Sequence, residues 1–209
     1  NKADFPTTYT HGATVTLPTP VAEGFTFDGW KMKSSDEPAA SLTLNDSDAC
    51  YGSTVTLIAC WKQIKPTITV DLGNGMEKRS LERKYGVSFP LRDILQLLYA
   101  DKYSTNTVYP TRDYYTFDGW TVTYTKTGVT ETYLKGAKPF GFTVGDSDVE
   151  IKAIWTPITY TISFNPGTGG TLSDGSLTDG KLILTYPELV EAIGEPGQLV
   201  GAVAIGYPA

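Results

Sequence analysis

The chain contains few of the side chains from which catalytic and metal sites are usually built. Among its 209 residues there are one histidine, His11, and two cysteines, Cys50 and Cys60. A catalytic triad needs a histidine beside a nucleophile, and structural zinc sites need several histidine or cysteine ligands. His11 precedes a glycine, and a solvated turn residue is its favoured interpretation. The scarcity of histidine therefore argues against triads and multi-histidine metal sites.

The two cysteines lie ten positions apart, which fits neither a zinc signature nor the Cys-x-x-Cys motif of redox proteins. Two unrelated small residues are the favoured interpretation, and a disulfide on suitably placed strands is the alternative. The chain also lacks a Gly-x-Ser-x-Gly elbow and a phosphate-binding glycine loop. We therefore predict no catalytic residues, no metal, no cofactor and no enzyme activity.

Basic charge and long apolar runs are also scarce. The 17 Lys and Arg residues are outnumbered by 23 Asp and Glu residues, which gives a formal net charge of -6. The densest basic patch, residues 77–84, is diluted by glutamates, and a solvated strand or turn is favoured there over a phosphate-binding site. No apolar run approaches the roughly 18 residues that span a membrane. We expect no nucleic-acid partner and no membrane insertion.

Aromatic residues, in contrast, make up 12% of the chain and follow a repeat. The sequence Thr-Phe-Asp-Gly-Trp occurs at residues 26–30 and again, 90 positions later, at residues 116–120. Each copy is followed by a stretch that ends in Ala-x-Trp, at Trp61 and Trp155, so all four tryptophans belong to one pattern. A fixed period of this kind indicates a tandem array of modules.

The repeat divides the chain into three predicted modules. The first module, residues 1–63, lacks an opening strand, and the second, residues 64–157, carries a helix insertion. The third, residues 158–209, is partial, because the chain stops where the next Thr-Phe-Asp-Gly-Trp is due. The polar opening of the chain has no signal-peptide pattern, so we expect a piece of a longer polypeptide. Incomplete terminal modules expose strand edges. We expect these ends to be covered either by packing on the middle module or by self-association with a neighbouring chain, head to tail.

Alternation of apolar and polar residues predicts the strands of these modules. The opening strand of the second module has Ile68, Val70 and Leu72 on one face, and residues 73–75 turn the chain toward a second strand that ends near residues 87–89. A strand is also predicted from Thr14 to Leu17. The closing strands at residues 55–61 and 149–155 alternate in the same way. The glycine inside each aromatic motif predicts a bulge or a close backbone approach.

Helices are predicted in the second and third modules. Leu91, Ile94, Leu95 and Leu98 have the spacing of one helix face within residues 91–100. In the third module a capping box at Thr185 starts a helix, whose cap and face residues are Glu188, Tyr186, Leu189, Val190 and Ile193. The order strand, strand, helix, strand, strand predicts an α+β, mainly β fold. We expect tandem small β-grasp-like (ubiquitin-like) modules with a mixed sheet.

The recurring motifs resemble the Listeria–Bacteroides repeat, the internalin-type B repeat of bacterial surface proteins. They are the strand and glycines at residues 160–170, the Thr-Leu-Pro-x-Pro segment at residues 16–20, the Thr-Phe-Asp-Gly-Trp copies and the Ala-x-Trp endings. The helix insertion departs from that family. The resemblance implies an extracellular array at the cell surface or cell wall, with a role in spacing or adhesion, and it carries over no catalytic residues. An unknown host protein or glycan is the expected partner.

Two further groups of residues invite a functional interpretation. Asp46 and Asp48 recur as Asp146 and Asp148, and such alternate carboxylates can bind Ca²⁺, although turn-forming residues are favoured here. Tyrosines around the insertion give an alternative function, a carbohydrate-binding module. These tyrosines are Tyr99, Tyr103, Tyr109, Tyr114 and Tyr124.

The repeated aromatic motif itself is predicted to build the core of each module rather than a binding surface. In particular, we expect the phenylalanine and tryptophan of each copy to pack against the tryptophan of the closing strand. The residues of this structural motif are Phe27, Gly29, Trp30, Trp61, Phe117, Gly119, Trp120 and Trp155.

Overall fold

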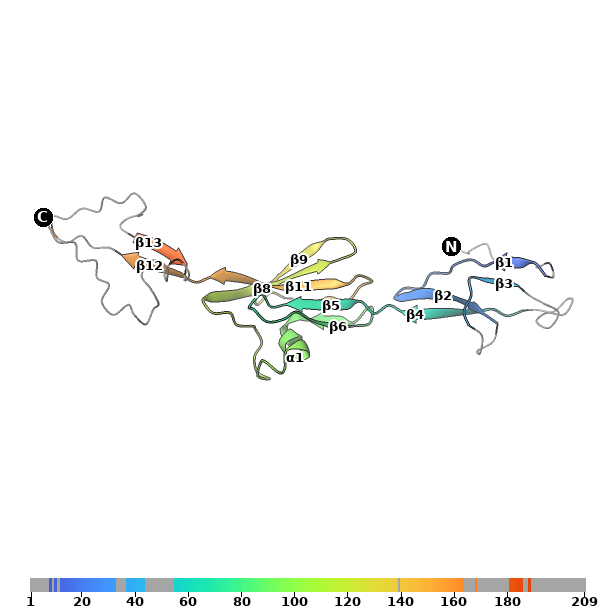
Figure 1. Ribbon diagram of the computed structural model, residues 1–209, viewed down its shortest axis with the longest axis horizontal. Helices are drawn as coiled ribbons and strands as arrows, with labels where there is room; N and C mark the ends of the chain where they lie inside the picture. The colour runs from blue at the N-terminus through green and yellow to red at the C-terminus, as the bar shows by residue number, and fades with distance from the viewer. Residues whose placement is uncertain are drawn as a thin grey trace.

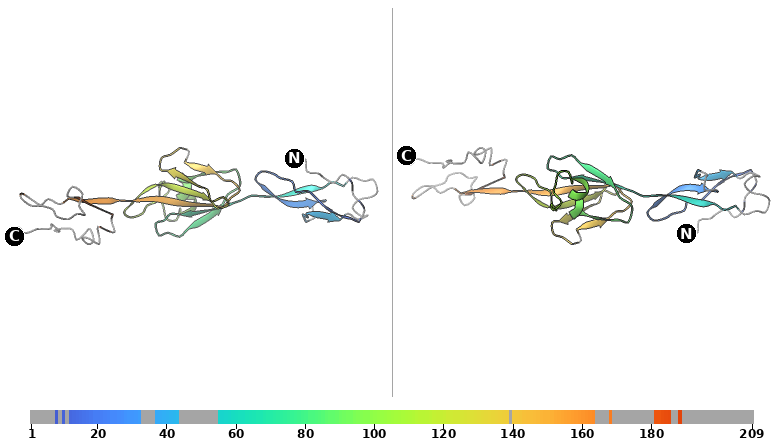
Figure 2. Two further views of the ribbon diagram at one scale, coloured as in Figure 1. Left: turned by 90° about the horizontal axis from the view of Figure 1, so that it is seen from above. Right: turned by 90° about the horizontal axis from the view of Figure 1, so that it is seen from below.

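The protein is an elongated string of β-sheets (Figure 1). The computed structural model describes residues 8, 10, 12–32, 37–43, 55–138, 140–163, 168, 181–185 and 188. In these residues strands predominate, and the one α-helix among them is short. Views from above and below show the same succession of sheets along the long axis (Figure 2). The prediction of an α+β, mainly β protein with a mixed sheet is confirmed.

The predicted second module contains a five-stranded sheet. Its strands are β5 (Thr67–Asp71), β6 (Arg79–Glu82), β8 (Tyr115–Tyr124), β9 (Thr130–Leu134) and β11 (Val149–Pro157). They lie in the order β6-β5-β11-β8-β9. The central strand β11 pairs parallel with β5 and antiparallel with β8, so the sheet is mixed. As the alternation predicts, Ile68, Val70 and Leu72 are fully buried.

A short helix covers one face of this sheet (Figure 1). A 3-10 turn, η1 (Leu91–Asp93), leads into α1 (Ile94–Leu98). The predicted helix is confirmed, although it is shorter than residues 91–100. Its predicted apolar face is buried in the core at Leu91, Ile94 and Leu95, and Leu98 packs against that core. Burial of this apolar face thus explains why a helix forms at the residues whose spacing predicts one.

One predicted strand is divided in two. The sequence predicts a single second strand that ends near residues 87–89, whereas β6 ends at Glu82 and a separate strand, β7 (Ser88–Pro90), follows. Gly86, with φ of 78°, turns the chain between them. As a result β6 pairs with β5, and β7 pairs with β10 (Gly141–Thr143).

The two outer modules contain smaller sheets. In the first, β1 (Thr14–Thr16) pairs with β3 (Ser41–Thr43), and β2 (Phe25–Lys31) pairs with β4 (Ile58–Gln63). In the third, β12 (Thr159–Ser163) pairs with β13 (Lys181–Thr185). The strand predicted to begin at Thr14 is confirmed. The Thr185 N–H and hydroxyl both donate to Glu188, as in a capping box, at 2.7 Å. The rest of that predicted helix lies outside the described residues.

The first and second modules share one frame. The pair β2–β4 corresponds to β8–β11, and β1–β3 corresponds to β7–β10. The correspondence extends to individual hydrogen bonds. Leu17 N–H donates to the Ala40 carbonyl in the first module, and Leu91 N–H donates to the Phe140 carbonyl in the second, both at 3.2 Å. The helix insertion, residues 92–112, stands where the first module has only residues 18–22.

Candidate functional site

The repeated motif forms the same irregular strand in both modules. In β2 the register with β4 shifts between Phe27 and Gly29, and in β8 the register with β11 shifts between Phe117 and Gly119. The aspartate between them, Asp28 or Asp118, is therefore the extra residue of a β-bulge. Each copy of the motif bends its strand at the same place.

The motif glycines allow a neighbouring backbone to come close. Gly29 has φ of 135° and Gly119 has φ of 154°. A Cβ atom at Gly119 would lie 2.2 Å from the Tyr133 carbonyl oxygen in β9, and one at Gly29 would lie 2.7 Å from the Ala39 nitrogen. The bulge and the close approach, which the sequence offered as alternatives, thus occur together at both glycines.

The aromatic residues of each motif form a chain of edge contacts. In the first module, the Phe27 ring lies 5.5 Å from that of Trp30 and 5.4 Å from that of Trp61. In the second, Phe117 lies 5.1 Å from Trp120 and 5.5 Å from Trp155. These centroid distances and T-shaped geometries are typical of favourable aromatic pairs. The phenylalanine therefore joins the motif tryptophan to that of the closing strand in both modules.

The indole N–H groups distinguish the two copies. The Trp30 Nε1–H donates to the Pro18 carbonyl at 2.9 Å, and the Trp155 Nε1–H donates to the Leu72 carbonyl at 2.8 Å. Trp120 is fully buried, and its Nε1–H has no hydrogen-bond partner in the described part of the chain. The position equivalent to Pro18 is Arg92, which begins the insertion. In the second module the insertion therefore stands in place of the loop whose Pro18 carbonyl accepts the Trp30 Nε1–H in the first module.

The motif aspartates bind across the sheet rather than facing a cavity. Asp28 pairs with Lys62 at 2.5 Å, and Asp118 accepts a hydrogen bond from the Thr156 hydroxyl. Lys62 and Thr156 occupy equivalent positions, opposite Thr26 and Thr116 respectively. These aspartates hold the bulged strand to the closing strand.

The second Asp-Ser-Asp segment closes a loop. The Asp148 carboxylate accepts the Thr67 N–H at 2.7 Å, and Asp146 pairs with Lys126 at 2.5 Å, a contact that lowers the pKa of Asp146. The buried Ser147 hydroxyl accepts the Lys126 N–H at 3.0 Å. Asp46 and Asp48 lie outside the described residues, as do His11 and Cys50; Cys60 is a half-buried free cysteine. Within the described ranges, no three potential metal ligands gather.

One of the five candidate sugar-binding tyrosines is not at the surface. Tyr99 is fully buried, so its assignment as a ligand contact is corrected. Its hydroxyl donates toward the Val70 and Glu77 carbonyls, each at 3.0 Å, and burial raises its pKa. Tyr99 therefore anchors the end of the helix to β5.

The other four candidate tyrosines contact different parts of the second module. Tyr103, Tyr109 and Tyr124 are half-buried against the core, and Tyr109 stacks on Phe117 at 5.3 Å. The Tyr103 hydroxyl accepts from the Asn74 amide at 3.0 Å, and the Tyr124 hydroxyl donates to Glu131 at 3.2 Å. Tyr114 is exposed, with φ of 65°, at the position that Gly24 occupies in the first module. The described contacts do not assemble the five tyrosines into one exposed platform.

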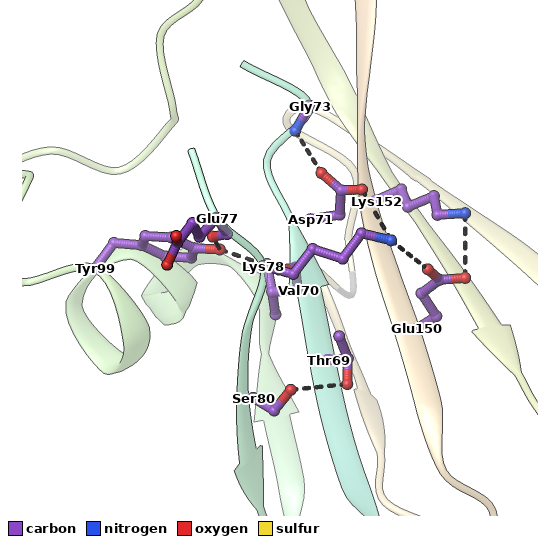
Figure 3. Close-up of polar contacts among 10 residues, drawn as sticks. All are labelled: Thr69, Val70, Asp71, Gly73, Glu77, Lys78, Ser80, Tyr99, Glu150 and Lys152. Atoms are coloured by element: carbon purple, nitrogen blue, oxygen red, sulfur yellow. Dashed lines mark hydrogen bonds and ion pairs between the residues drawn. The ribbon is translucent and has the colours of Figure 1, made fainter. Parts of the chain in front are cut away.

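Charged residues form a network on the sheet around β5 and β11 (Figure 3). Lys78 Nζ lies 3.3 Å from an Asp71 oxygen and 3.2 Å from a Glu150 oxygen, and Lys152 pairs with Glu150 at 3.1 Å. The two lysines lower the pKa of Glu150. Both lysines are exposed and both carboxylates are partly exposed, so the network is solvated and contributes little to the free energy of folding. The basic patch of the sequence thus forms structural ion pairs.

A cavity of about 290 Å³ lies near the helix end and is lined by Met76, Glu77, Arg79, Tyr99 and Lys102. Arg79 there pairs with Asp101 and lowers the pKa of that carboxyl to about 2. The Arg79 guanidinium also donates to the Leu98 carbonyl at 2.7 Å and lies over the Tyr99 ring. The lining pairs no nucleophile with a base, and its charges attach the insertion to β6.

A contact between the first two modules was not predicted from the sequence. The Tyr85 N–H donates to the Ile64 carbonyl at 3.0 Å, and the Tyr85 hydroxyl donates to Glu23 at 2.8 Å. A Cβ at Gly24 would lie 2.8 Å from the Tyr85 ring, so that ring lies directly on the Gly24 backbone. We call this junction, formed by Glu23, Gly24, Ile64 and Tyr85, the Tyr85 clasp. The one feature of the sequence that points to this contact is the short connection between Gln63 and Thr67, which keeps the two modules close together.

One family model matches part of the chain. Residues 1–60 match the family model of the Listeria-Bacteroides repeat domain. The match confirms the resemblance over the first module and indicates a bacterial surface repeat domain. No curated protein and no solved structure matches the chain. Among the described residues, no helix has the length and apolarity to cross a membrane.

Proposed function

We propose that this chain, whose first 60 residues match the Listeria-Bacteroides repeat domain, is a non-catalytic extracellular array of a bacterial surface protein. In this role its modules act as a spacer that displays neighbouring surfaces for adhesion. Repeats of this family are usually found in bacterial surface proteins, which supports a location at the cell surface or cell wall. Several modest contacts along one array act together and strengthen attachment to a host protein or glycan.

The Tyr85 clasp is the observation that carries the spacer role. A flexible linker would let adjacent modules rotate freely, whereas the backbone between β4 and β5 is bonded on both sides. Arg83 N–H donates to the Pro66 carbonyl at 3.2 Å, and Ile64 N–H donates to the Gly24 carbonyl at 2.9 Å. With the Tyr85 contacts, these bonds continue the β5–β6 ladder back toward the first module. A junction of this kind suits a stiff rod.

The fold of the second module supports the same function. Its central strands β5 and β11 are parallel, the hairpin partners β6 and β9 lie at the edges, and one helix packs on the sheet. We propose that this arrangement is the β-grasp fold expected from the sequence. Small modules of this type, predicted here at residues 1–63, 64–157 and 158–209, can be strung in tandem without sharing a core.

Small-angle X-ray scattering tests the spacer role. The intact chain is expected to give the scattering of a stiff, elongated particle. Tyr85→Ala removes the ring and the hydroxyl of the clasp, so it should broaden the distribution of overall dimensions. Thr132→Ala, on exposed β9, is the control and should leave the curve unchanged. Scattering from the intact chain that already requires freely rotating modules would refute the proposal.

The alternative is a carbohydrate-binding module that uses the remaining tyrosines. Tyr114 is 41% exposed, and Arg112 lies 3.8 Å above the neighbouring Tyr115 ring, which leaves one polar and aromatic patch near the insertion. The buried Tyr99 weakens this alternative. A glycan array on which the chain binds a sugar, with loss of binding in Tyr114→Ala but an unchanged melting temperature, would favour it. The spacer proposal predicts a blank array.

A further inference from the structure

The five-stranded sheet of the second module has two edges, and they are built differently. One edge is β6, which carries basic side chains in and beside the strand, at Lys78, Arg79, Arg83 and Lys84. The helix α1 contacts β6, and the Arg79 guanidinium donates to the Leu98 carbonyl at the helix end. Charged side chains and a covering helix keep a strand edge from pairing with other strands. The edge at β6 is therefore protected.

The other edge, β9, lacks this protection (Figure 1). Glu131 is the one charged residue between Val129 and Leu134. Val129 is 54% exposed and Leu134 is 57% exposed. In the described part of the chain, β9 pairs with β8 alone. An edge strand with exposed apolar residues and a single charge is available for pairing with another strand.

The backbone of β9 presents hydrogen-bonding groups to the outside in a defined pattern. The Tyr124 N–H donates to the Val129 carbonyl at 2.9 Å, so these residues form a hydrogen-bonded pair of the β8–β9 ladder. Bonded and non-bonded pairs alternate along an antiparallel ladder, so the first, third and fifth residues of β9 direct their N–H groups away from the sheet. These residues are Thr130, Thr132 and Leu134.

The side chains of the same strand place a carboxylate at this edge. The Tyr124 hydroxyl donates to Glu131 Oε2 at 3.2 Å, and the Tyr133 hydroxyl donates to the same oxygen at 2.5 Å. Neither bond uses Oε1 of Glu131, which is an exposed residue. The two tyrosines thus orient a carboxylate whose other oxygen can accept a charge-assisted hydrogen bond from a cation outside the module.

We propose that β9 receives an extended segment of a host protein as an added strand, and that Glu131 favours a segment with a basic residue at its centre. The inference rests on the proposed adhesion role and names the class of partner. Val129, Glu131 and Tyr133 lie on one face of β9 and belong to the closely spaced pairs of such an added ladder. The matching segment therefore alternates apolar, polar, basic, polar and apolar residues. In strand addition the backbone provides affinity, and alternate side chains provide specificity.

A nuclear magnetic resonance titration tests where such a segment binds. The probe is the peptide Thr-Val-Thr-Lys-Thr-Val-Thr with blocked ends, which reads the same in both directions and so fits either strand direction. The largest shifts should occur at the outward amides of Thr130, Thr132 and Leu134, and the amides of β6 should move little. A titration without shifts, or with its largest shifts on β6, would overturn the proposal.

A proline at the edge tests the backbone contact. Thr132→Pro removes an outward N–H without removing a bond of the β8–β9 ladder, so it should weaken peptide binding by about ten-fold or more. Thr132→Ala keeps the N–H and should bind as the unmodified chain does. Equal binding by the two variants, with matching circular dichroism, would contradict the proposal.

A charge exchange tests the role of Glu131. Glu131→Lys should bind the Lys-centred peptide about three-fold more weakly and prefer a peptide with Glu in place of that Lys. Glu131→Gln should show no preference between the two peptides. The same ranking of the peptides by the unmodified chain and by Glu131→Lys would refute the role of the carboxylate.

Two further results separate this inference from its neighbours. A mass above that of one chain without peptide, lost in Thr132→Pro, would show that a second copy occupies the edge and would overturn the proposal. A chain that binds no peptide but scatters X-rays as a stiff rod would also overturn it, and the spacer role would stand.

Discussion

The first and second modules share a motif but not a core. Both have the same bulge, the same glycine contact and the same aromatic chain. In the second module the hairpin β5–β6 extends the sheet and the helix covers one face of it, and Trp120 is fully buried. Trp30, in contrast, retains 9% exposure and a hydrogen bond to the Pro18 carbonyl. The motif therefore sets the shape of a strand pair, and the elements around it decide how much stability it provides.

The largest expected difference between the modules lies at the motif tryptophans. Trp120→Ala should lower the free energy of unfolding of the second module by about 3–5 kcal/mol, because a fully buried large side chain leaves a cavity. Trp30→Ala is the matched change and should cost the first module less. Thermal unfolding followed by tryptophan fluorescence measures both. Equal losses of unfolding free energy in the two variants would show that the surrounding elements do not change how much the motif tryptophan stabilises its module.

The motif glycine gives the next largest effect. Gly119→Ala places a Cβ against the Tyr133 carbonyl oxygen and forces a strained φ, which together should cost more than the roughly 1–3 kcal/mol of backbone strain alone. Gly136→Ala is the control, since Gly136 also has positive φ but open space around it. In denaturant unfolding, the free energy of unfolding of Gly119→Ala should be well below that of Gly136→Ala. The reverse order would contradict the close-approach interpretation.

The insertion exists only in the second module, and Tyr99 tests what it contributes. Tyr99→Phe keeps the ring but leaves the Val70 and Glu77 carbonyls without its hydroxyl, which should cost about 1–2 kcal/mol. Tyr103→Phe removes a half-buried hydroxyl and should cost less. Hydrogen exchange of the β5 amides reports the loss locally. Unchanged protection in Tyr99→Phe would mean that the insertion is not anchored through this hydroxyl.

The smallest expected effect is a pH dependence of the same insertion. The Arg79 guanidinium lowers the pKa of Asp101 from 3.8 to about 2 in the folded protein. A lowered folded-state pKa stabilises the fold above the unfolded pKa, and this contribution disappears as the pH falls through about 2. Asp101→Asn should therefore melt slightly below the unmodified chain at neutral pH, and the two melting temperatures should converge near pH 2. Because the pair is exposed, added salt should also reduce the difference.

Strong periodic patterns were predictable from the sequence. The buried face of β5 and the core face of the helix follow from regular spacing of apolar residues, and the bulge follows from a glycine inside a strand pattern. Strand β9 was not predicted, because its residues 130–134 are mostly exposed and carry no clear alternation. Strands β3 and β10 were also missed, because three residues are too few to show an alternation.

The tertiary contacts were the least predictable part. Tyr99 follows the helix as one more tyrosine in a tyrosine-rich segment, and only the position of β5 shows that its hydroxyl is buried. Tyr85 belongs to no motif. Its contact with Glu23 depends on the relative orientation of two sheets that the short connection between β4 and β5 joins. The insertion also removes the carbonyl that an equivalent of Pro18 would offer to Trp120. No local pattern encodes these relations.

A distance between the first two modules tests the central claim, that the Tyr85 clasp fixes adjacent modules as a rod. Spin labels can be attached at Thr19→Cys and Thr132→Cys, two exposed positions, in a chain that also carries Cys50→Ser and Cys60→Ser. Electron–electron double resonance should then give one narrow distance distribution, which becomes broad when Tyr85→Ala is added. A broad distribution in the chain with Tyr85 intact would contradict the account.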